Sequence, residues 1–161
     1  MHVFISHVAK DFELARDLAV RLEEERILAW YYERDALPGP DYLRQIGKAV
    51  EESLAFVLLA SSKSLTSSDV MNEIVRAYET RRPIFPVLID IDHAEIEDRQ
   101  PVWIQALGAA ASISLRDLGI SEAFSKILAE VRALSPGPPP CQRIVRLSTK
   151  SPRSDSPRRG R

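Results

Sequence analysis

The chain has 161 residues, of which 45% are hydrophobic and 28% are charged. This composition is ordinary for one globular domain with a single core. The net charge of −1 combines two unequal parts, because residues 1–134 carry −7 and residues 135–161 carry +6. Binding to phosphate backbones depends on Lys and Arg, so the acidic part excludes nucleic acid as a main partner and leaves only weak contacts of the basic tail.

The cysteine and histidine content excludes several classes of site. Cys141 is the only cysteine, so the chain has no intramolecular disulfide and no cysteine-based zinc site. His2, His7 and His93 lack the spacing of metal ligands, and we expect no bound metal. No apolar stretch approaches the roughly 18 residues of a membrane span, and the first residues lack the pattern of a signal peptide. We therefore expect a cytoplasmic protein without a membrane segment.

The first half of the chain alternates apolar runs with amphipathic segments. Val3–Ser6 is typical of a short buried strand. Lys10–Glu25 has apolar residues three and four positions apart, which predicts an amphipathic helix, and Ile27–Tyr31 predicts a second buried strand. The two prolines and the glycine of Glu33–Asp41 predict a loop. Tyr42–Glu52 again has helical spacing.

The alternation continues in the second half. Leu54–Ala60 is the most apolar segment and predicts a central strand. Asp69–Thr80 predicts a helix that turns its apolar residues inward, Tyr78 among them. Ile84–Ile89 predicts a strand with a bulge or a near-edge position, because Pro86 cannot donate a backbone hydrogen bond.

The last predicted elements are shorter and less regular. Asp90–Arg99 is an acidic connection with about one helical turn, and Val102–Leu107 predicts a short helix. Ala111–Ser114 predicts a weak fifth strand, and Ser121–Leu134 predicts a terminal helix capped by its first serine. Residues 135–161 hold six of the eleven prolines, which predicts a Pro- and Arg-rich disordered tail or linker.

Strands that alternate with helices predict a parallel sheet covered on both faces. The expected fold class is α/β, a doubly wound, flavodoxin-like sheet of five parallel strands in a three-layer α/β/α arrangement, with one domain over residues 1–134. Such sheets bind ligands beyond the carboxyl ends of their strands. Those ends are Ser6-His7, Tyr31-Tyr32 and Ser61-Ser62.

Three features near these ends are candidates for chemistry. Ser6 would face the cleft, and His7 could stack on a ring or bond to a ribose, although a lone histidine is often a turn residue. The loop Arg34–Pro40 is stiffened by its prolines and lies where sites occur, yet it could be a plain connector. Glu73 borders the buried face of its helix, one step from Ile74. It could stabilise positive charge on a sugar carbon, or it could be a solvated surface residue.

Other sites are excluded by missing motifs. The chain contains no G-x-G-x-x-G, Walker A, H-E-x-x-H or G-x-S-x-G sequence. A response regulator would need a phosphoacceptor aspartate at the end of the third strand, where Ala60-Ser61-Ser62 stands instead.

Four segments, taken in order, resemble the Toll/interleukin-1 receptor (TIR) domain family over about residues 2–134. They are VFISHVAKD, ERDALPGPDYLRQIGKAVEES, SLAFVLLASSKSLTSSDVMNEI and RRPIFPVLID. The first is similar to the opening strand and turn of TIR domains, where F-I-S-Y-x-x-x-D is common. The third resembles the family pattern S-x-W-x-x-x-E, with Ser67 and Glu73 in place and Asp69 at the tryptophan position.

The resemblance implies a bacterial-type TIR domain that cleaves the nicotinamide–ribose bond of NAD⁺. The products would be nicotinamide and ADP-ribose or a cyclic ADP-ribose isomer. Glu73 would be the catalytic residue, and NAD⁺ would be the substrate, with no metal and no separate cofactor. The implied substrate-binding residues are Ser6, His7, Arg34, Leu37, Pro38, Tyr42 and Ser67, the last of which would hold the start of the Glu73 helix.

The resemblance also implies partners. TIR domains assemble head to tail through the loop that Leu37–Pro40 matches, and they act with a sensor protein or a fused sensor domain. We expect a role in immune or antiphage signalling. A non-catalytic TIR–TIR interaction scaffold is the alternative, which Asp69 at the tryptophan position favours. A nucleoside-processing transferase is a third, weaker interpretation.

Overall fold

The computed structural model describes residues 1–108 and 110–134, so the predicted tail at residues 135–161 lies outside the described residues. Its strands are β1 (Val3–Ser6), β2 (Ala29–Trp30), β3 (Ala55–Ala60), β4 (Ile84–Leu88) and β5 (Ile113–Ser114). Its α-helices are α1 (Phe12–Glu24), α2 (Tyr32–Asp35), α3 (Tyr42–Glu51), α4 (Ser68–Glu79), α5 (His93–Arg99), α6 (Pro101–Leu107), α7 (Leu115–Leu118) and α8 (Ile120–Leu134). None of these helices is both long and apolar enough to cross a membrane.

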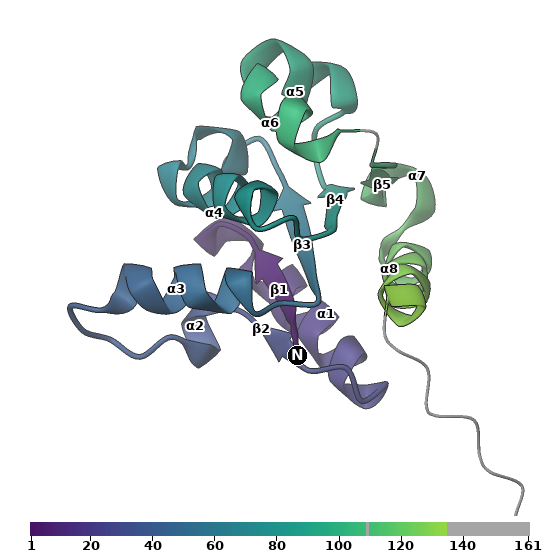
Figure 1. Cartoon of the computed structure of the whole chain (residues 1–161). Coiled ribbons are helices and arrows are strands. Elements are labelled where there is room, and N and C mark those ends of the chain that lie inside the picture. The colour runs from purple at the N-terminus through teal and green to yellow at the C-terminus, as the bar shows by residue number, and fades with distance from the viewer. Residues whose placement is uncertain (109, 135–161) are drawn as a thin grey trace, which may run out of the picture.

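The five strands are parallel and follow the order β2-β1-β3-β4-β5 (Figure 1). This order confirms the predicted doubly wound, flavodoxin-like α/β fold. The chain runs outward from β1 to β2 and then returns past β1 to β3, so the strand order reverses between β1 and β3. Sheets of this kind bind ligands beyond the carboxyl ends of the strands at such a reversal. Ser6 and Ser61 lie at that place.

Helices cover both faces of the sheet and bury a core on each (Figure 1). Helices α1 and α8 pack on one face, where β1 contributes Val3 and Ile5. Helices α3, α4 and α6 pack on the other, where Phe4 stacks on Phe56 of β3 with ring centroids 5.4 Å apart. Successive side chains of a strand point to opposite faces. Ser6 therefore shares the face of Phe4 and points toward α3 and α4.

The edge strands are shorter than predicted. Strand β2 covers two residues of the predicted Ile27–Tyr31, and β5 covers two residues of Ala111–Ser114. The predicted loop at Glu33–Asp41 is also shorter, because it begins with the helical turn α2. The Asp35 carboxylate accepts a hydrogen bond from the Tyr31 backbone N–H at 3.0 Å, and this contact closes the turn.

The C-terminal part of the domain contains more helix than the sequence predicts. Helix α5 is seven residues long, where about one turn is predicted, because Asp92 and Glu95 form a reciprocal capping box. Helix α7 is an additional element, and the Ser114 side chain caps it. Helix α8 begins at Ile120, so Ser121 lies inside the helix and the prediction that it is the cap is wrong.

Tyr78 departs from the predicted core. Its side chain is half exposed, so the prediction that it points inward is wrong. The buried stripe of α4 runs through Val70, Ile74 and Ala77. Tyr78 lies one helical step, about 100°, beyond Ala77 and falls outside that stripe.

The near-edge prediction for Pro86 is confirmed, since β4 lies beside the edge strand β5. The Ile89 N–H donates to the Ala60 carbonyl of β3 at 2.9 Å. In a strand between two neighbours, the backbone groups of successive residues point to alternate neighbours, so those of Leu88 and Pro86 point toward β5. Strand β5, however, begins only opposite Val87. Among the described residues, Pro86 thus has no paired strand on the side where its N–H is missing.

Candidate functional site

A short contact joins the end of β1 to the middle of α4. The Ser6 hydroxyl donates a hydrogen bond to Glu73 Oε2 at 2.5 Å. Ser6 is fully buried and Glu73 is partly buried. The strand end and the helix come together because Ser6 follows Phe4 on the sheet face that α4 covers. The structure therefore brings two of the predicted site residues into direct contact.

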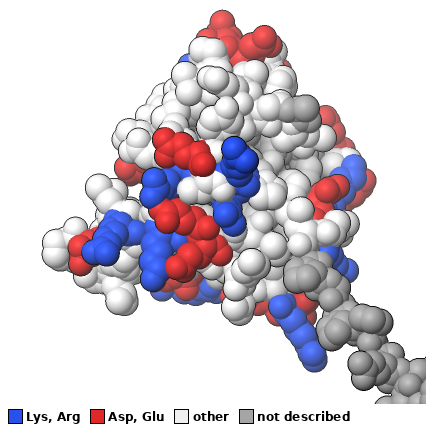
Figure 2. Space-filling view, viewed as in Figure 1, with Lys and Arg blue, Asp and Glu red and all other residues white. Residues whose placement is uncertain are grey.

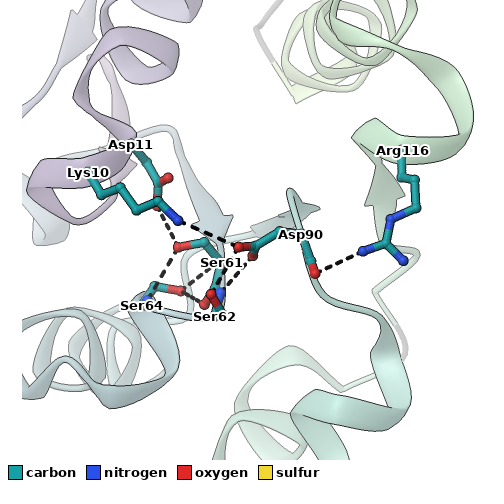
Figure 3. Close-up of polar contacts among 7 residues, drawn as sticks. All are labelled: Lys10, Asp11, Ser61, Ser62, Ser64, Asp90 and Arg116. Atoms are coloured by element: carbon teal, nitrogen blue, oxygen red, sulfur yellow. Dashed lines mark hydrogen bonds and ion pairs between the residues drawn. The ribbon is translucent and has the colours of Figure 1, made fainter.

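The start of α4 is fixed by a turn of serines at the end of β3 (Figure 3). The Ser61 hydroxyl donates to the buried Asp11 carboxylate at 2.5 Å, and the Ser64 hydroxyl donates to the Ser61 carbonyl at 2.9 Å. The Ser67 side chain then accepts a hydrogen bond from the Val70 N–H at 3.3 Å and caps α4. Together these contacts set the direction in which α4 carries Glu73 past the sheet.

Asp90 ties the ends of β3 and β4 together (Figure 3). Its carboxylate accepts hydrogen bonds from the Ser62 N–H at 2.7 Å and the Ser62 hydroxyl at 2.9 Å, and Lys10 Nζ lies 3.8 Å away. Burial opposes ionisation of Asp90, but the bonds from Ser62 and the charge of Lys10 lower its pKa below the usual value. Arg116 donates to the Asp90 carbonyl at 2.9 Å. The rim beside the site is thus held by polar contacts across several elements.

Glu73 lies in a groove of about 660 Å³ between α3 and α4. The α4 wall consists of residues at helical spacing, namely Asp69, Asn72, Glu73 and Arg76. The α3 wall and its end contribute Leu43, Arg44, Ile46, Gly47, Lys48, Val50, Glu51 and Glu52. Figure 2 shows acidic and basic side chains gathered over α3 and α4. The groove has the size of a small-molecule site, which is typically about 300–1,000 Å³.

The environment of Glu73 makes its carboxyl group a weaker acid than an ordinary glutamate. Burial raises the pKa of Glu73 to about 7, and the charges of Asp69 and Glu33 act in the same direction. The hydrogen bond from Ser6 acts in the opposite direction, because it stabilises the ionised form. Near neutral pH this carboxyl is therefore present in both protonation states. Such a group can serve either as an ionised electrostatic partner or as a proton donor.

A second hollow, of about 610 Å³, lies at the loop that precedes α3. It contains three predicted site residues, Leu37, Pro38 and Tyr42. The Tyr42 ring packs edge-on against Tyr32, with centroids 5.1 Å apart. Burial raises the pKa of Tyr42 to about 12, helped by Tyr32 and by the charges of Asp69 and Glu73. Tyr42 thus stands between this hollow and the acidic end of the groove.

The loop is held in shape from α3. The Leu37 N–H donates to Gln45 Oε1 at 2.9 Å, and Gln45 Nε2 donates back to the Leu37 carbonyl at 3.0 Å. Gly39 has φ +152°, a conformation that favours glycine. The backbone of the loop therefore has a defined conformation, as the prolines and the glycine predict. The Leu37 side chain nevertheless remains 71% exposed.

His7 faces inward. Its side chain is 2% exposed, Nδ1 lies 3.1 Å from the Ile5 carbonyl, and Nε2 lies 2.9 Å from Glu33 Oε2. The ring also meets Tyr31 at a centroid distance of 6.3 Å. The structure places His7 beside Ser6 and connects it to the second hollow through Glu33, which lines that hollow.

Arg34 is turned away from both hollows. Its guanidinium donates to Glu23 at 2.7 Å, to Asp35 at 2.9 Å and to the Ala29 carbonyl, and it lies 4.8 Å from the Tyr31 ring centroid. These acceptors belong to α1, to β2 and to α2 itself. The structure does not bring Arg34 together with the other predicted site residues.

Several residues of the site have no counterpart in the sequence prediction. Asn72 and Arg76 follow Asp69 by three and seven positions, so helical periodicity could have placed them on the groove face. No sequence signal marks Glu33 or Gln45, because their contacts depend on the conformation of the loop and of α2.

Comparisons with known proteins agree with this fold. The family model of the TIR domain matches residues 3–128. Among solved structures, the TIR domains of the activated Roq1 resistosome are similar, with 22% identity and a TM-score of 0.65, covering 81% of this chain and 98% of that one. The TIR domain of the Toll-related receptor TRR-2 from Hydra magnipapillata has 18% identity and a TM-score of 0.63, covering 81% and 97%.

A metazoan TIR-STING receptor from C. gigas is also similar, with 25% identity and a TM-score of 0.63. The match covers 81% of this chain but 39% of the receptor. No curated protein matches the chain significantly.

Proposed function

This chain belongs to the TIR domain family, and we propose that it cleaves the nicotinamide–ribose bond of NAD⁺. The observation that carries the proposal is the contact of Glu73 with Ser6 inside the groove between α3 and α4. This site provides a carboxyl group that can be protonated or ionised near neutral pH and a hydroxyl group that orients it. The groove is large enough for part of a dinucleotide. NAD⁺ is the substrate, and no separate cofactor takes part.

The proposed reaction breaks the bond between the ribose C1′ and the nicotinamide nitrogen. The bonding electrons leave with nicotinamide, which becomes neutral, and positive charge develops on the ribose. The ionised Glu73 carboxylate stabilises this oxocarbenium-like ribose and binds its hydroxyls, while Ser6 holds the carboxylate in place. Attack by water gives ADP-ribose, attack by the adenine of the same molecule gives a cyclic isomer, and either route releases one proton to solvent.

The remaining predicted residues take supporting roles in this proposal. Leu37, Pro38 and Tyr42 form the hollow next to the groove and would hold the part of NAD⁺ that extends beyond the ribose. Ser67 caps α4 and so positions Glu73, and His7 positions Glu33, which lines the second hollow. For Arg34, whose guanidinium is occupied by Glu23 and Asp35, we propose an indirect role in holding α2 and the loop.

We further propose that the chain works by TIR–TIR assembly in the cytoplasm, in immune signalling of the bacterial antiphage type, under a separate or fused sensor. The similarity to the Roq1 resistosome supports this context, since that structure is described as activated and as recognising a pathogen effector. The exposed Leu37, on the loop beside the second hollow, provides an apolar contact for a neighbouring copy.

Incubation with NAD⁺ tests the proposed reaction. Purified protein, both dilute and concentrated with a crowding agent, is mixed with NAD⁺, and chromatography follows nicotinamide, ADP-ribose and cyclic isomers. We expect nicotinamide to appear in equal amounts to the ribosyl product. Absence of nicotinamide release from assembled protein would contradict the proposal.

A non-catalytic scaffold is the second candidate function. The exposure of Leu37 and Leu43, at 71% and 69%, favours it, because Leu37 lies on the loop, Leu43 lies in the first turn of α3, and both are available to another TIR domain. In that case the protein would associate without consuming NAD⁺. Light scattering combined with the nicotinamide assay separates the two functions, since only the enzyme couples association to nicotinamide release.

A further inference from the structure

Asp69 is a second carboxylate on the groove face of α4. It precedes Glu73 by four residues, so the two side chains lie one above the other along the helix, and both line the groove. Within residues 1–108 and 110–134, the exposed side chain of Asp69 has no hydrogen-bond or ion-pair partner. By contrast, Arg76 further along the groove is paired with Glu51 across from it and with Glu79 at 3.6 Å.

The charged groups at this end of the groove are mainly acidic. Glu73 faces Asp69 on its own helix and Glu33 from α2, while Tyr42 from α3 contributes a neutral phenol. The cations of the groove are Arg44 and Lys48 on α3 and Arg76 on α4, and Lys48 is 3.6 Å from Glu52. Arg76 is likewise occupied by glutamates. A ligand that enters beside Glu73 thus meets two carboxylates, Glu73 and Asp69, for which the described residues provide no ion pair.

We propose that Asp69 makes this groove select a pyridine nucleotide in its oxidised form, whose nicotinamide ring is a cation. The inference rests on the proposed function, because it names the charge state of the substrate that the same groove takes. NAD⁺ and NADH share their ribose, pyrophosphate and adenine groups, and their nicotinamide rings differ in charge. A carboxylate a few ångströms from the ring, at a partly solvated site, favours the cation by about threefold to tenfold.

Asp69 acts on binding more than on the chemical step. Its attraction is to the cationic ring before the bond breaks, and that ring becomes neutral as nicotinamide leaves. As the bond breaks, the positive charge moves to the neighbouring ribose carbon and stays near Asp69, so the interaction is about equal in the ground state and the transition state and lowers KM with little change in kcat.

Ligand binding to Glu73→Gln protein tests the proposal, because this variant should bind NAD⁺ while it cleaves NAD⁺ about a hundredfold or more slowly. Calorimetric titrations at pH 8 compare NAD⁺ with NADH, first for Glu73→Gln and then for Glu73→Gln/Asp69→Asn. We expect the first protein to bind NAD⁺ about threefold to tenfold more tightly than NADH, and the double variant to bind them almost equally. Asp98→Asn in the same background is the control, since it removes the same charge from an exposed position on α5. It should leave the preference unchanged.

Kinetics of the otherwise unchanged enzyme give a second measurement. Asp69→Asn should raise the KM for NAD⁺ by about the same factor at pH 8, with kcat within about twofold. A preference for NAD⁺ that survives Asp69→Asn would overturn the role of Asp69 and leave the proposed cleavage intact. If neither nucleotide binds and the unchanged protein releases no nicotinamide, both proposals fail together.

Discussion

Glu73 lowers the stability of the fold when it is ionised. Its pKa rises from an ordinary value of 4.5 to about 7, chiefly because burial removes water from the carboxylate. Between these two values the folded chain binds more protons than the unfolded chain does. The free energy of unfolding contributed by this group therefore falls as the pH rises from 4.5 through 7, and the loss persists above pH 7.

The substitution Glu73→Gln should stabilise the protein while it removes activity. Glutamine can still accept the hydrogen bond from Ser6, and it carries no charge to bury. We expect a gain of about 3 kcal/mol in the free energy of unfolding at pH 8 and less than about 1 kcal/mol at pH 5. Urea unfolding at both pH values measures it. Glu97→Gln, at an exposed position of α5, is the control and should show no such gain. A gain that does not depend on pH would be evidence against the buried charge.

The two serines after β3 provide a matched pair of variants. Ser61 is buried and donates to the buried Asp11, whereas Ser62 donates to Asp90, whose side chain is 38% exposed. Ser61→Ala leaves a buried carboxylate short of a donor and should cost about 2 kcal/mol. Ser62→Ala should cost less than about 1 kcal/mol, because water replaces the hydroxyl. Thermal or urea unfolding compares them, and equal losses would contradict the assigned roles.

The loop before α3 depends on a contact from the helix that follows it. Gln45 bonds to both the N–H and the carbonyl of Leu37. Gln45→Leu should free the Leu37 amide, and its hydrogen exchange should accelerate by about tenfold, as expected for the loss of one such bond. Gln45→Glu keeps the acceptor for that amide and loses only the donor, so it should change this exchange less. Unchanged exchange in Gln45→Leu would show that the loop is held by other contacts.

Helices and strands with strong hydrophobic periodicity lie where the sequence predicts them, whereas the edge strand and the short helices do not. The buried stripe of α4 and the apolar run of β3 are local patterns, so their positions agree with the prediction within a residue or two. Strand β2 depends on its pairing with β1, and helix α2 depends on a side-chain contact, the bond from the Tyr31 N–H to Asp35. Helix α7 depends on a side-chain cap from Ser114, which a short apolar segment does not reveal.

The order of strands determines how much of the site can be predicted. The contact between Ser6 and Glu73 spans 67 positions in the sequence and follows from β1 and β3 being neighbours, with α4 packed over both. Predicting the fold class therefore placed both residues at the same edge of the sheet. Arg34 shows the limit of that reasoning. A residue at a carboxyl end can turn to either side of the sheet, and Arg34 turns to Glu23 on α1.

Assembly should control activity at the level of the whole molecule. If neighbouring copies complete the site, nicotinamide release per molecule should increase with protein concentration. Gly39→Ala should raise the concentration for half-maximal activity several-fold, because φ +152° strains an alanine and the loop must change shape. Gly119→Ala, at φ +76° between α7 and α8, is the control for strain away from the loop. Activity per molecule that stays constant from dilute monomer to assembly would contradict this part of the proposal.

Nicotinamide release by Glu73→Gln tests the central claim most directly. The assay compares the unchanged protein, Glu73→Gln and the control Glu97→Gln at pH 8, under the same assembled conditions and with folding verified by circular dichroism. The proposed role of the carboxylate predicts that Glu73→Gln loses about a hundredfold or more in rate, while Glu97→Gln retains full activity. Turnover of NAD⁺ by Glu73→Gln at the rate of the unchanged protein would contradict the account.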